Sequence, residues 1–259
     1  MNAPRRQQIG AAFAAAHDYD RHARVQARIA QGLAARIAAL PLPPAPAVLE
    51  IGCGTGHLTA ALGETGLGGH WLVTDLAPAM VERARTRLGE TPQRRFAALD
   101  GEHGPGPAGA PFDLVCSSLA FQWFEDPARA ARRLMGWVRP GGWLALATLG
   151  ERTFSEWRAA HAALGLHPGT VPLPGPDALA ALFPGARILV GTEIESHADA
   201  RDFLRAIKGI GAATPAPGHR PLRAGALRRV MRAFEKDGAR ATYQVVTVLW
   251  QRREDRPQR

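Results

Sequence analysis

Three glycines at alternate positions, Gly52, Gly54 and Gly56, follow a short apolar run that contains Glu50. The run, residues 48–51, predicts a buried parallel strand, and the glycines permit a sharp turn whose backbone can approach a ligand closely. The spacing is not the G-x-G-x-x-G dinucleotide fingerprint, and no Lys-Ser or Lys-Thr follows, as a phosphate-binding loop requires. The pattern therefore indicates a cofactor loop that does not centre on a phosphate, with a ligand-free glycine turn as the alternative.

Two carboxylates follow the next two predicted strands. Asp75 ends the strand 71–75, and Asp100 follows the strand 96–99. An acid at the carboxyl end of the strand beside a glycine loop can accept hydrogen bonds from both ribose hydroxyls of a nucleoside. The alternative for Asp75 is a solvated strand-end acid or a helix cap.

Other groups that often carry chemistry are absent from the sequence or scattered in it. No Ser-His-Asp or Cys-His constellation stands out, and the nine histidines do not have a spacing that places two ligands on one helix face. We therefore expect no metal. Cys53 and Cys116 fall at the ends of predicted strands, where reduced core residues are expected in a cytoplasmic protein.

The elements that must position these residues alternate between strands and helix-length segments. Predicted strands at 48–51, 71–75, 96–99, 112–118 and 143–148 favour a parallel, doubly wound α/β sheet with its ligand crevice at the carboxyl ends. Before them, residues 5–40 predict a helical cap, with Val25, Ile29, Leu33, Ile37 and Leu40 as one apolar stripe. Asp126 and Pro127 predict the start of a helix, and the turn 139–142 predicts its end.

These motifs resemble those of the class I S-adenosylmethionine-dependent methyltransferases. The motif acidic-x-Gly-x-Gly-x-Gly is filled by the residues from Glu50 to Gly56, and Asp75, Asp100, the strand 112–118 and the turn 140–142 follow in the family's order. The resemblance implies a Rossmann-like, seven-stranded sheet, with strand 187–190 and an antiparallel last strand at 243–250. It implies S-adenosylmethionine as cofactor, with Asp100 at the adenine amino group. The cofactor residues that we expect are Glu50, Gly52, Gly54, Gly56, Asp75, Leu76, Asp100, Gly101 and Leu119.

We expect one domain, 1–259, because 259 residues with 46% hydrophobic content can bury one sizeable core. Its parts are the cap (1–40), a cofactor-binding core (47–148), a substrate and partner region with a helical insertion (149–240) and the last strand (241–251).

Three further segments narrow the resemblance. Tyr19-Asp20 with Gln26, the run 119–123 and Lys208-Gly209-Ile210-Gly211-Ala212 are similar to the malonyl-acyl carrier protein O-methyltransferases of biotin synthesis. The similarity extends over nearly the whole chain, although 161–176 and the tail from Glu254 match poorly. It implies methyl transfer to the free carboxylate of malonyl-acyl carrier protein, which gives the ester that primes pimeloyl chain synthesis.

The carboxylate is already a nucleophile, so the expected task of the protein is to align it with the methyl group and to exclude water. We expect Tyr19 and Gln122 to position the carboxylate and Trp123 to form an aromatic wall beside the sulfonium. A methyltransferase that acts on a small free acid or a quinone precursor is the alternative.

The net charge of +9, from 32 basic and 23 acidic residues, suggests nucleic acid, an anionic membrane or an acidic protein as partner, and an arginine-rich composition without a binding role is the alternative. Arg201, Arg205 and Lys208 share one face of a predicted helix, which we expect to contact the acidic carrier protein; a solvated helix face is the alternative. Nucleic acid is disfavoured because the aromatic residues cluster beside the glycine loop rather than among the arginines. Arg5-Arg6 precedes an apolar run too short for an export signal, and we expect neither membrane association nor export.

Overall fold

The computed structural model describes residues 5–16, 18–236 and 238–254. The first four residues of the predicted cap, His17 and the end of the tail therefore lie outside the described residues. The strands are β1 (Ala47–Ile51), β2 (His70–Asp75), β3 (Arg94–Ala98), β4 (Phe112–Ser118), β5 (Val138–Leu149), β6 (Arg187–Ser196) and β7 (Arg240–Gln251). The helices are α1 (Arg5–Ala14), α2 (Tyr19–His22), α3 (Arg24–Ala38), α4 (His57–Glu64), α5 (Pro78–Leu88), the short 3-10 helix η1 (Phe121–Trp123), α6 (Pro127–Gly136), α7 (Ser155–Ala162), α8 (Pro176–Leu182), α9 (Ala200–Gly209) and α10 (Ala224–Lys236).

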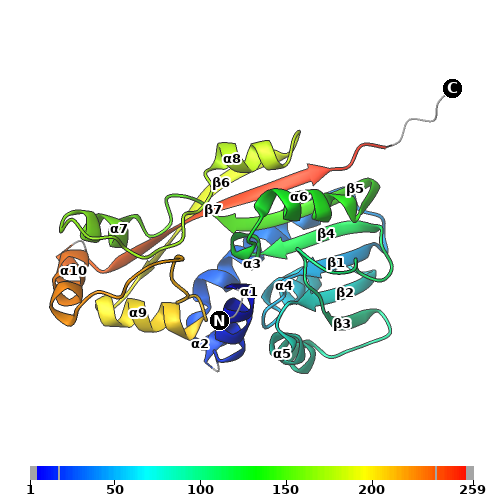
Figure 1. Cartoon of the computed structure of the whole chain (residues 1–259). Helices are drawn as coiled ribbons and strands as arrows, with labels where there is room; N and C mark the ends of the chain where they lie inside the picture. The colour runs from blue at the N-terminus through cyan, green and yellow to red at the C-terminus, as the bar shows by residue number, and fades with distance from the viewer. Residues whose placement is uncertain (1–4, 17, 237, 255–259) are drawn as a thin grey trace.

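The strands form one seven-stranded sheet in the order β3-β2-β1-β4-β5-β7-β6 (Figure 1). Strands β1 to β5 are parallel, and β7 runs antiparallel to both of its neighbours, β5 and β6. The predicted doubly wound sheet and its antiparallel last strand are confirmed. Consequently the carboxyl ends of β1, β2 and β4 lie at one edge, where the glycine loop and Asp75 begin.

Alternating side chains of the sheet bury two apolar layers. On one face Val48 and its neighbours pack against α3, α4 and α5, whereas on the other face Leu49 and its neighbours pack against α6 and α8. Four residues of the predicted stripe are buried in α3, with Val25, Ile29, Leu33 and Ile37 at most 4% exposed, whereas Leu40 lies beyond the end of the helix and is half-buried. Helix α3 is therefore part of the core and gives the cap a rigid base.

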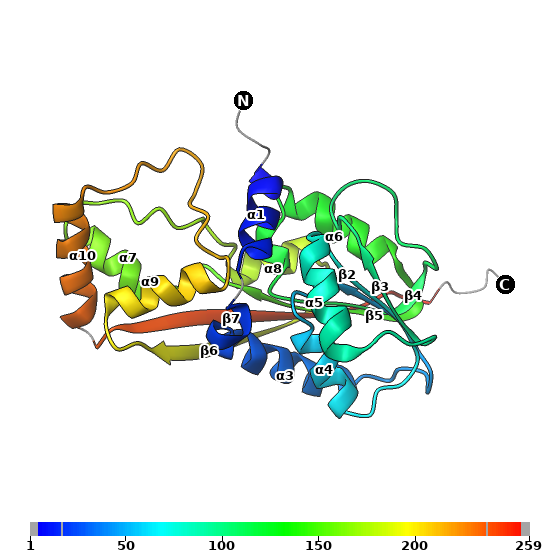
Figure 2. The ribbon, with the colours of Figure 1, turned by 90° about the horizontal axis from the view of Figure 1, so that it is seen from below.

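Strands β6 and β7 are long enough to reach beyond the rest of the sheet, and α7, α9 and α10 pack on that extension (Figure 2). The aromatic residues Trp157, Phe203, Phe234 and Tyr243 form the core of this part. The predicted strand 187–190 is thus only the first part of β6, which continues to Ser196 by pairing with Arg240. Helices α7, α9 and α10 correspond to the predicted helical insertion before the last strand.

Two predicted helices end differently in the structure. The helix of the cap is not continuous. The guanidinium of Arg83 donates hydrogen bonds to the carbonyl groups of Ala14 and Ala16 at 2.8 and 2.7 Å, and these are acceptors that a longer helix would use. After α6, which Asp126 caps as predicted, the helix ends at Gly136, before the predicted stop. Val138 instead begins β5 and pairs with Phe112, because the start of β4 offers its backbone a partner.

Among the helices of the described residues, none has both the length and the apolar character that crossing a bilayer requires.

Candidate active site

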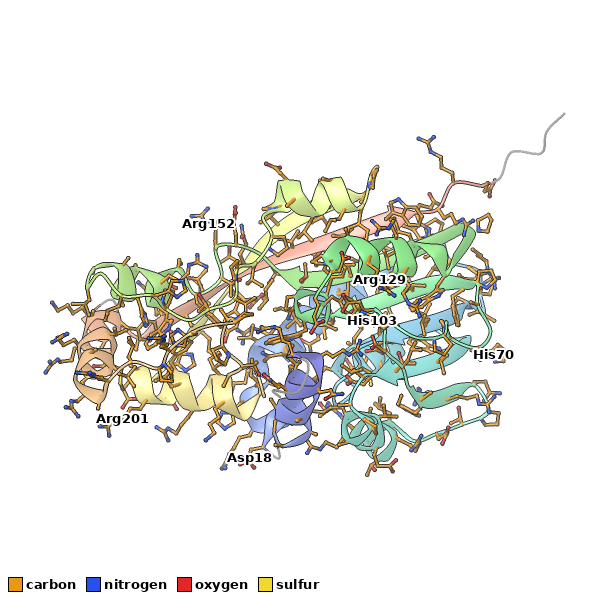
Figure 3. All side chains as sticks on the ribbon, viewed as in Figure 1. Asp18, His70, His103, Arg129, Arg152 and Arg201 are labelled. Carbon is orange, nitrogen blue, oxygen red and sulfur yellow. The ribbon has the colours of Figure 1, made fainter. Side chains whose placement is uncertain are left out.

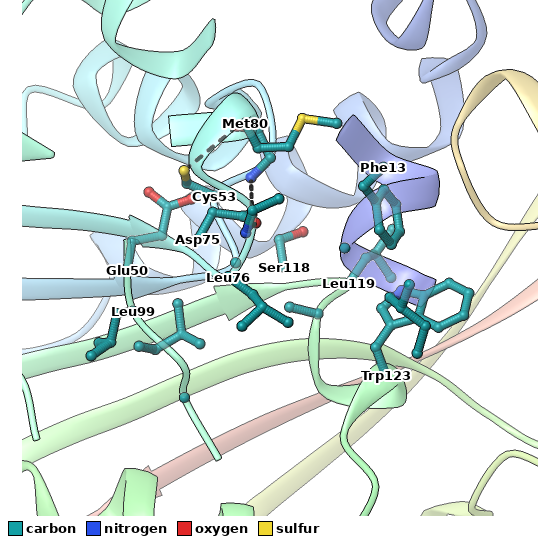
Figure 4. Close-up of a pocket in the computed structure, with 18 of the residues that line it drawn as sticks. Phe13, Glu50, Cys53, Asp75, Leu76, Met80, Leu99, Ser118, Leu119 and Trp123 are labelled. Atoms are coloured by element: carbon teal, nitrogen blue, oxygen red, sulfur yellow. Dashed lines mark hydrogen bonds between the residues drawn. The ribbon is translucent and has the colours of Figure 1, made fainter. Parts of the chain in front are cut away.

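A cavity lies at the carboxyl ends of β1, β2 and β4, beside α1 (Figure 4). It collects ten of the predicted site residues: Tyr19, Glu50, Gly52, Gly54, Asp75, Leu76, Asp100, Gly101, Leu119 and Trp123. Gly56 and Gln122 do not line it. We call it the first cavity, and its lining joins the glycine loop, the strand-end acids and the cap.

The three glycines of the loop do three different things. A Cβ on Gly52 would lie 2.3 Å from the Cβ of Ala120, so this glycine lets the loops after β1 and β4 touch. A Cβ on Gly56 would lie 2.5 Å from Leu88, so this glycine lets α5 pack against the start of α4. Gly54 alone of the three faces open space, with the Tyr19 hydroxyl 3.8 Å from its Cβ position. All three have a positive φ, which a side chain would strain.

Asp75 holds the loop and also faces the first cavity. Its Oδ2 accepts a hydrogen bond from the Gly54 N–H at 2.9 Å, and its Oδ1 accepts one from the Ala77 N–H at 2.8 Å. Burial raises the pKa of Asp75, while these two backbone donors act in the opposite direction. Each carboxylate oxygen retains a lone pair that can accept a hydrogen bond from a hydroxyl group.

Glu50 lies under the loop and is 1% exposed. The hydroxyl of Thr59 donates a hydrogen bond to its Oε2. Burial raises the pKa of Glu50 from 4.5 to about 7, with a smaller contribution from the charge of Asp75 and an opposing one from Thr59. A group that titrates in this range beside the loop makes the local charge depend on pH.

Asp100 organises the loop after β3. Its Oδ1 accepts hydrogen bonds from the N–H groups of Glu102 and His103 at 2.9 and 3.0 Å. Its Oδ2 lies 3.6 Å from a guanidinium nitrogen of Arg6, which comes from α1. Asp100 therefore connects the core to the cap across the first cavity.

A second cavity adjoins the first and extends toward α7 and α9. Both cavities are lined by the same five residues, which we call the shared wall: Phe13, Tyr19, Gln26, Leu119 and Trp123. The rings of Phe13 and Trp123 meet edge to face, with centroids 5.5 Å apart (Figure 4). Two ligands, one in each cavity, would thus meet at this wall.

Gln122 belongs to the second cavity, where its amide is fixed by the fold. The Nε2 donates to the Leu119 carbonyl at 2.7 Å, and the Thr148 hydroxyl donates to the Oε1 at 3.0 Å. One N–H of the amide remains for a ligand. Leu119 has a φ of 56°, a strained backbone of the kind that often occurs at functional sites.

Tyr19 is held at the shared wall by its neighbour in the cap. The Oδ1 of Asp20 accepts a hydrogen bond from Thr55 at 2.6 Å and lies 3.1 Å from the Nε2 of His57. Both partners belong to the glycine loop or to the helix that follows it. Burial raises the pKa of the Tyr19 phenol well above its usual range, so the hydroxyl stays protonated and can donate.

The sequence motifs predict no site role for Phe13 or Gln26, yet both line the two cavities. The Oε1 of Gln26 is buried and has no hydrogen-bond partner within the described part of the chain. A buried acceptor of this kind needs a donor, which an ordered water or a ligand hydroxyl or N–H group supplies. Arg158, which lines the second cavity, was missed entirely, because no motif surrounds it.

The Lys208-Gly209-Ile210-Gly211 element joins α9 to the cap. A Cβ on Gly209 would lie 2.4 Å from the ring of His22, and one on Gly211 would lie 2.9 Å from the Cα of Phe13. Both glycines therefore permit a contact that a side chain would prevent. This contact supports Phe13, whose ring also touches the ring of Trp123.

The sheet order, the glycine loop and the strand-end acids at a cavity define a class I methyltransferase. Residues 49–144 match the family model of the methyltransferase domain. In fold the chain is similar to the YcgJ protein of Bacillus subtilis (TM-score 0.60, 16% identity, 87% of this chain and 99% of that one). It is also similar to the N-methyltransferase NodS of Bradyrhizobium japonicum, solved with S-adenosyl-L-homocysteine (TM-score 0.51, 16% identity, 90% and 88% covered).

Two relatives are much closer in sequence. The chain is 38% identical to the malonyl-[acyl-carrier protein] O-methyltransferase of Magnetococcus marinus over 99% of both chains. It is 46% identical to the biotin biosynthesis bifunctional protein BioCD of Bordetella avium over 92% of this chain, and it spans about half (51%) of that longer relative. The chain belongs to the malonyl-[acyl-carrier protein] O-methyltransferase family.

Proposed function

We propose that this protein transfers a methyl group from S-adenosylmethionine to the free carboxylate of malonyl-acyl carrier protein. The observation that carries the proposal is the shared wall, where a nucleoside-type cavity meets a largely apolar cavity and neutral donors lie between them. The resulting methyl ester would prime pimeloyl chain synthesis for biotin. The names of the sequence relatives support this choice of substrate.

The first cavity fits the cofactor by three features. Gly54 leaves open space that a Cβ would fill, Asp75 offers acceptors to ribose hydroxyls, and Leu76, 41% exposed, offers an apolar surface to an adenine ring. Asp100 at the far side is the proposed acceptor for the adenine amino group. When bound, S-adenosylmethionine supplies a methyl group activated by a positively charged sulfur.

The shared wall and the adjoining Gln122 of the second cavity supply neutral hydrogen-bond donors to the substrate carboxylate. These donors are the Tyr19 hydroxyl and the amide N–H groups of Gln26 and Gln122, and we propose that they orient one oxygen toward the methyl group. Methylation removes the negative charge of the carboxylate, so a cation at this point would stabilise the starting state more than the transition state. Phe13 and Trp123 exclude water, which would otherwise solvate the carboxylate.

Helix α9 supports the proposed carrier-protein partner because its two faces differ. The inner face contributes Leu204 and Ile207 to the second cavity. The outer face carries Arg201, Arg205 and Lys208, all exposed, and Arg201 points away from the molecule (Figure 3). An acidic carrier docked on this outer face would have the cavity directly beside it.

The test incubates the protein with methyl-labelled S-adenosylmethionine and three acceptors: malonyl-acyl carrier protein, free malonate and a quinone precursor. We expect the label in the carrier-bound malonyl group, seen as a mass increase of the carrier by one methylene unit. Methylation of malonate or of the quinone precursor at a higher kcat/KM would overturn the proposed substrate. Treatment of the product with an esterase should remove the added mass, because the new bond is an ester.

A further inference from the structure

Among the described residues, one guanidinium lines the second cavity, whose other walls are mainly aliphatic and aromatic side chains. It belongs to Arg158 in the middle of α7. Its Nη1 donates to the Thr153 carbonyl at 2.7 Å, which holds the side chain in place. No carboxylate within the described ranges lies within 4.0 Å of it, so its charge is not neutralised by an ion pair.

The helix that carries Arg158 lies away from the cap. Figures 1 and 2 both show α7 with α10 at one end of the molecule, whereas α1 lies toward the sheet core. Two loops cover the space between. The N–H of Ala216 donates to the Gly169 carbonyl at 2.9 Å, and both loops contribute to the lining. The cavity is thus an elongated, covered passage with neutral donors at one end and a cation at the other.

We propose that Arg158 binds the phosphate group of a phosphopantetheine arm whose acyl end reaches the shared wall. The inference rests on the proposed function, which requires a thioester carried on such an arm. A long chain with an anion at one end and a malonyl group at the other matches the order of groups along the passage. A guanidinium offers several N–H donors to a phosphate, and the apolar walls strengthen the interaction by excluding water.

The malonyl carboxylate is the other anion that Arg158 could bind, and the reaction argues against it. The carboxylate must lie at the shared wall to meet the methyl group, and it loses its charge during transfer. Pairing it with Arg158 would stabilise the starting state and lower the rate. The phosphate keeps its charge throughout, so its contact with Arg158 adds binding without opposing the chemistry.

The experiment compares malonyl-pantetheine with malonyl-phosphopantetheine, which differ only in the phosphate. In the wild type we expect the lower KM for the phosphorylated thioester. Arg158→Gln should raise that KM about ten- to a hundredfold, the effect of losing hydrogen bonds to a charged group, and should leave the KM for malonyl-pantetheine nearly unchanged. Arg158→Lys, which retains the charge, should recover part of the difference.

Arg152→Gln is the matched control, because Arg152 is exposed, does not line the passage and points away from it (Figure 3). An equal loss on both thioesters in Arg158→Gln would overturn the inference, since Arg158 would then act on the carboxylate or on the fold. Unchanged kinetics on both would also overturn it. Calorimetry with phosphopantetheine alone gives a second readout: wild type and Arg152→Gln should bind it, and Arg158→Gln should bind it much more weakly. If the wild type methylates neither thioester, the proposed function fails, and the calorimetry still decides whether Arg158 holds the phosphate.

Discussion

Glu50 is a buried acid whose pKa differs between the folded and the unfolded protein. Its pKa is raised to about 7 mainly by burial, against 4.5 in an unfolded chain. Between these values the folded state binds more protons than the unfolded state. The free energy of unfolding therefore falls as the pH rises through this window, and the contribution of Glu50 is fully present only below it.

The variant Glu50→Gln removes this titration and keeps an oxygen that Thr59 can bond. Since one pKa unit corresponds to about 1.4 kcal/mol, the variant should gain on the order of 3 kcal/mol relative to the wild type between about pH 4.5 and pH 8. Urea unfolding of both proteins across this range measures the difference. Parallel stability curves would show that Glu50 is ionised in both states.

Asp75 is the acceptor on which we expect cofactor affinity to depend most. Asp75→Asn retains one oxygen for the loop N–H groups but loses the charge and one acceptor. The affinity for S-adenosylhomocysteine should fall by about 1 to 3 kcal/mol, the usual range for hydrogen bonds to a charged group. Calorimetry measures this, with thermal unfolding as the control for the loop. An unchanged affinity in a folded variant would exclude Asp75 from the nucleoside site.

The sequence was sufficient to predict the residues that lie in local motifs, and insufficient for those brought together by folding. Gly54 and Asp75 follow strands whose carboxyl ends meet, so their proximity followed from the sheet alone. The distinct contact of Gly56 with Leu88 could not be predicted, because it depends on how α5 packs. Arg158 reaches the second cavity from a helix that has no characteristic spacing, and burial of its surroundings is visible only in the fold.

At the scale of elements, glycines at the end of α9 and just after it allow this segment to contact the cap closely. Gly211 has a φ of 71°, and a Cβ there would lie 2.9 Å from the Cα of Phe13 and 3.0 Å from the Ala12 carbonyl oxygen. Gly211→Ala should therefore strain the backbone by about 1 to 3 kcal/mol and displace Phe13 from the shared wall. We expect a lower kcat/KM for the thioester, with steady-state kinetics as the measurement.

Gly218→Ala is a matched control for the backbone effect. Gly218 has a similar φ of 75°, but a Cβ there has no atom within 4 Å. It should lose a comparable amount of stability in urea unfolding while its kcat/KM stays close to that of the wild type. Equal kinetic losses in the two variants would mean that the contact with Phe13 has no role in positioning.

The regular elements were predictable where local signals and tertiary packing agree. The buried strands, the stripe of α3 and the Asp126 cap of α6 are examples. The cap was predicted as a continuous helix and is interrupted, because Arg83, on a helix distant in sequence, donates hydrogen bonds to the carbonyl groups of Ala14 and Ala16. Likewise, β6 extends to Ser196 because β7 pairs with it, and pairing partners cannot be inferred from a single strand.

At the scale of the whole molecule, we expect the positive charge on the outer face of α9 to attract the acidic carrier protein more than charge elsewhere on the surface. Reversal of both Arg201 and Arg205 to Glu should raise the KM for malonyl-acyl carrier protein and flatten its salt dependence, since steering charges act through a field screened over about 10 Å at 0.1 M salt. Turnover of malonyl-coenzyme A, which lacks the acidic protein, should fall much less. Initial rates at several salt concentrations measure both effects.

Reversal of Arg228 and Arg229, which are exposed on α10, gives the same change in net charge elsewhere. This control should leave the KM for the carrier substrate closer to that of the wild type. If both double variants lose affinity equally, net charge rather than the α9 face attracts the carrier. If neither does, the arginines of α9 are a solvated surface.

The two cavities meet at the shared wall, and beyond it they are lined by different elements. A groove between α1 and the first turn of α5 shares Arg6, Leu76 and Asp100 with the first cavity. The second cavity is bounded by the loops that follow α7 and α9. Neither ligand must therefore pass through the place of the other, and the kinetic mechanism should be random, with intersecting initial-rate lines. A consequence is that S-adenosylhomocysteine and unmethylated substrate can bind together in a dead-end complex, so the enzyme should slow at high substrate when this product accumulates.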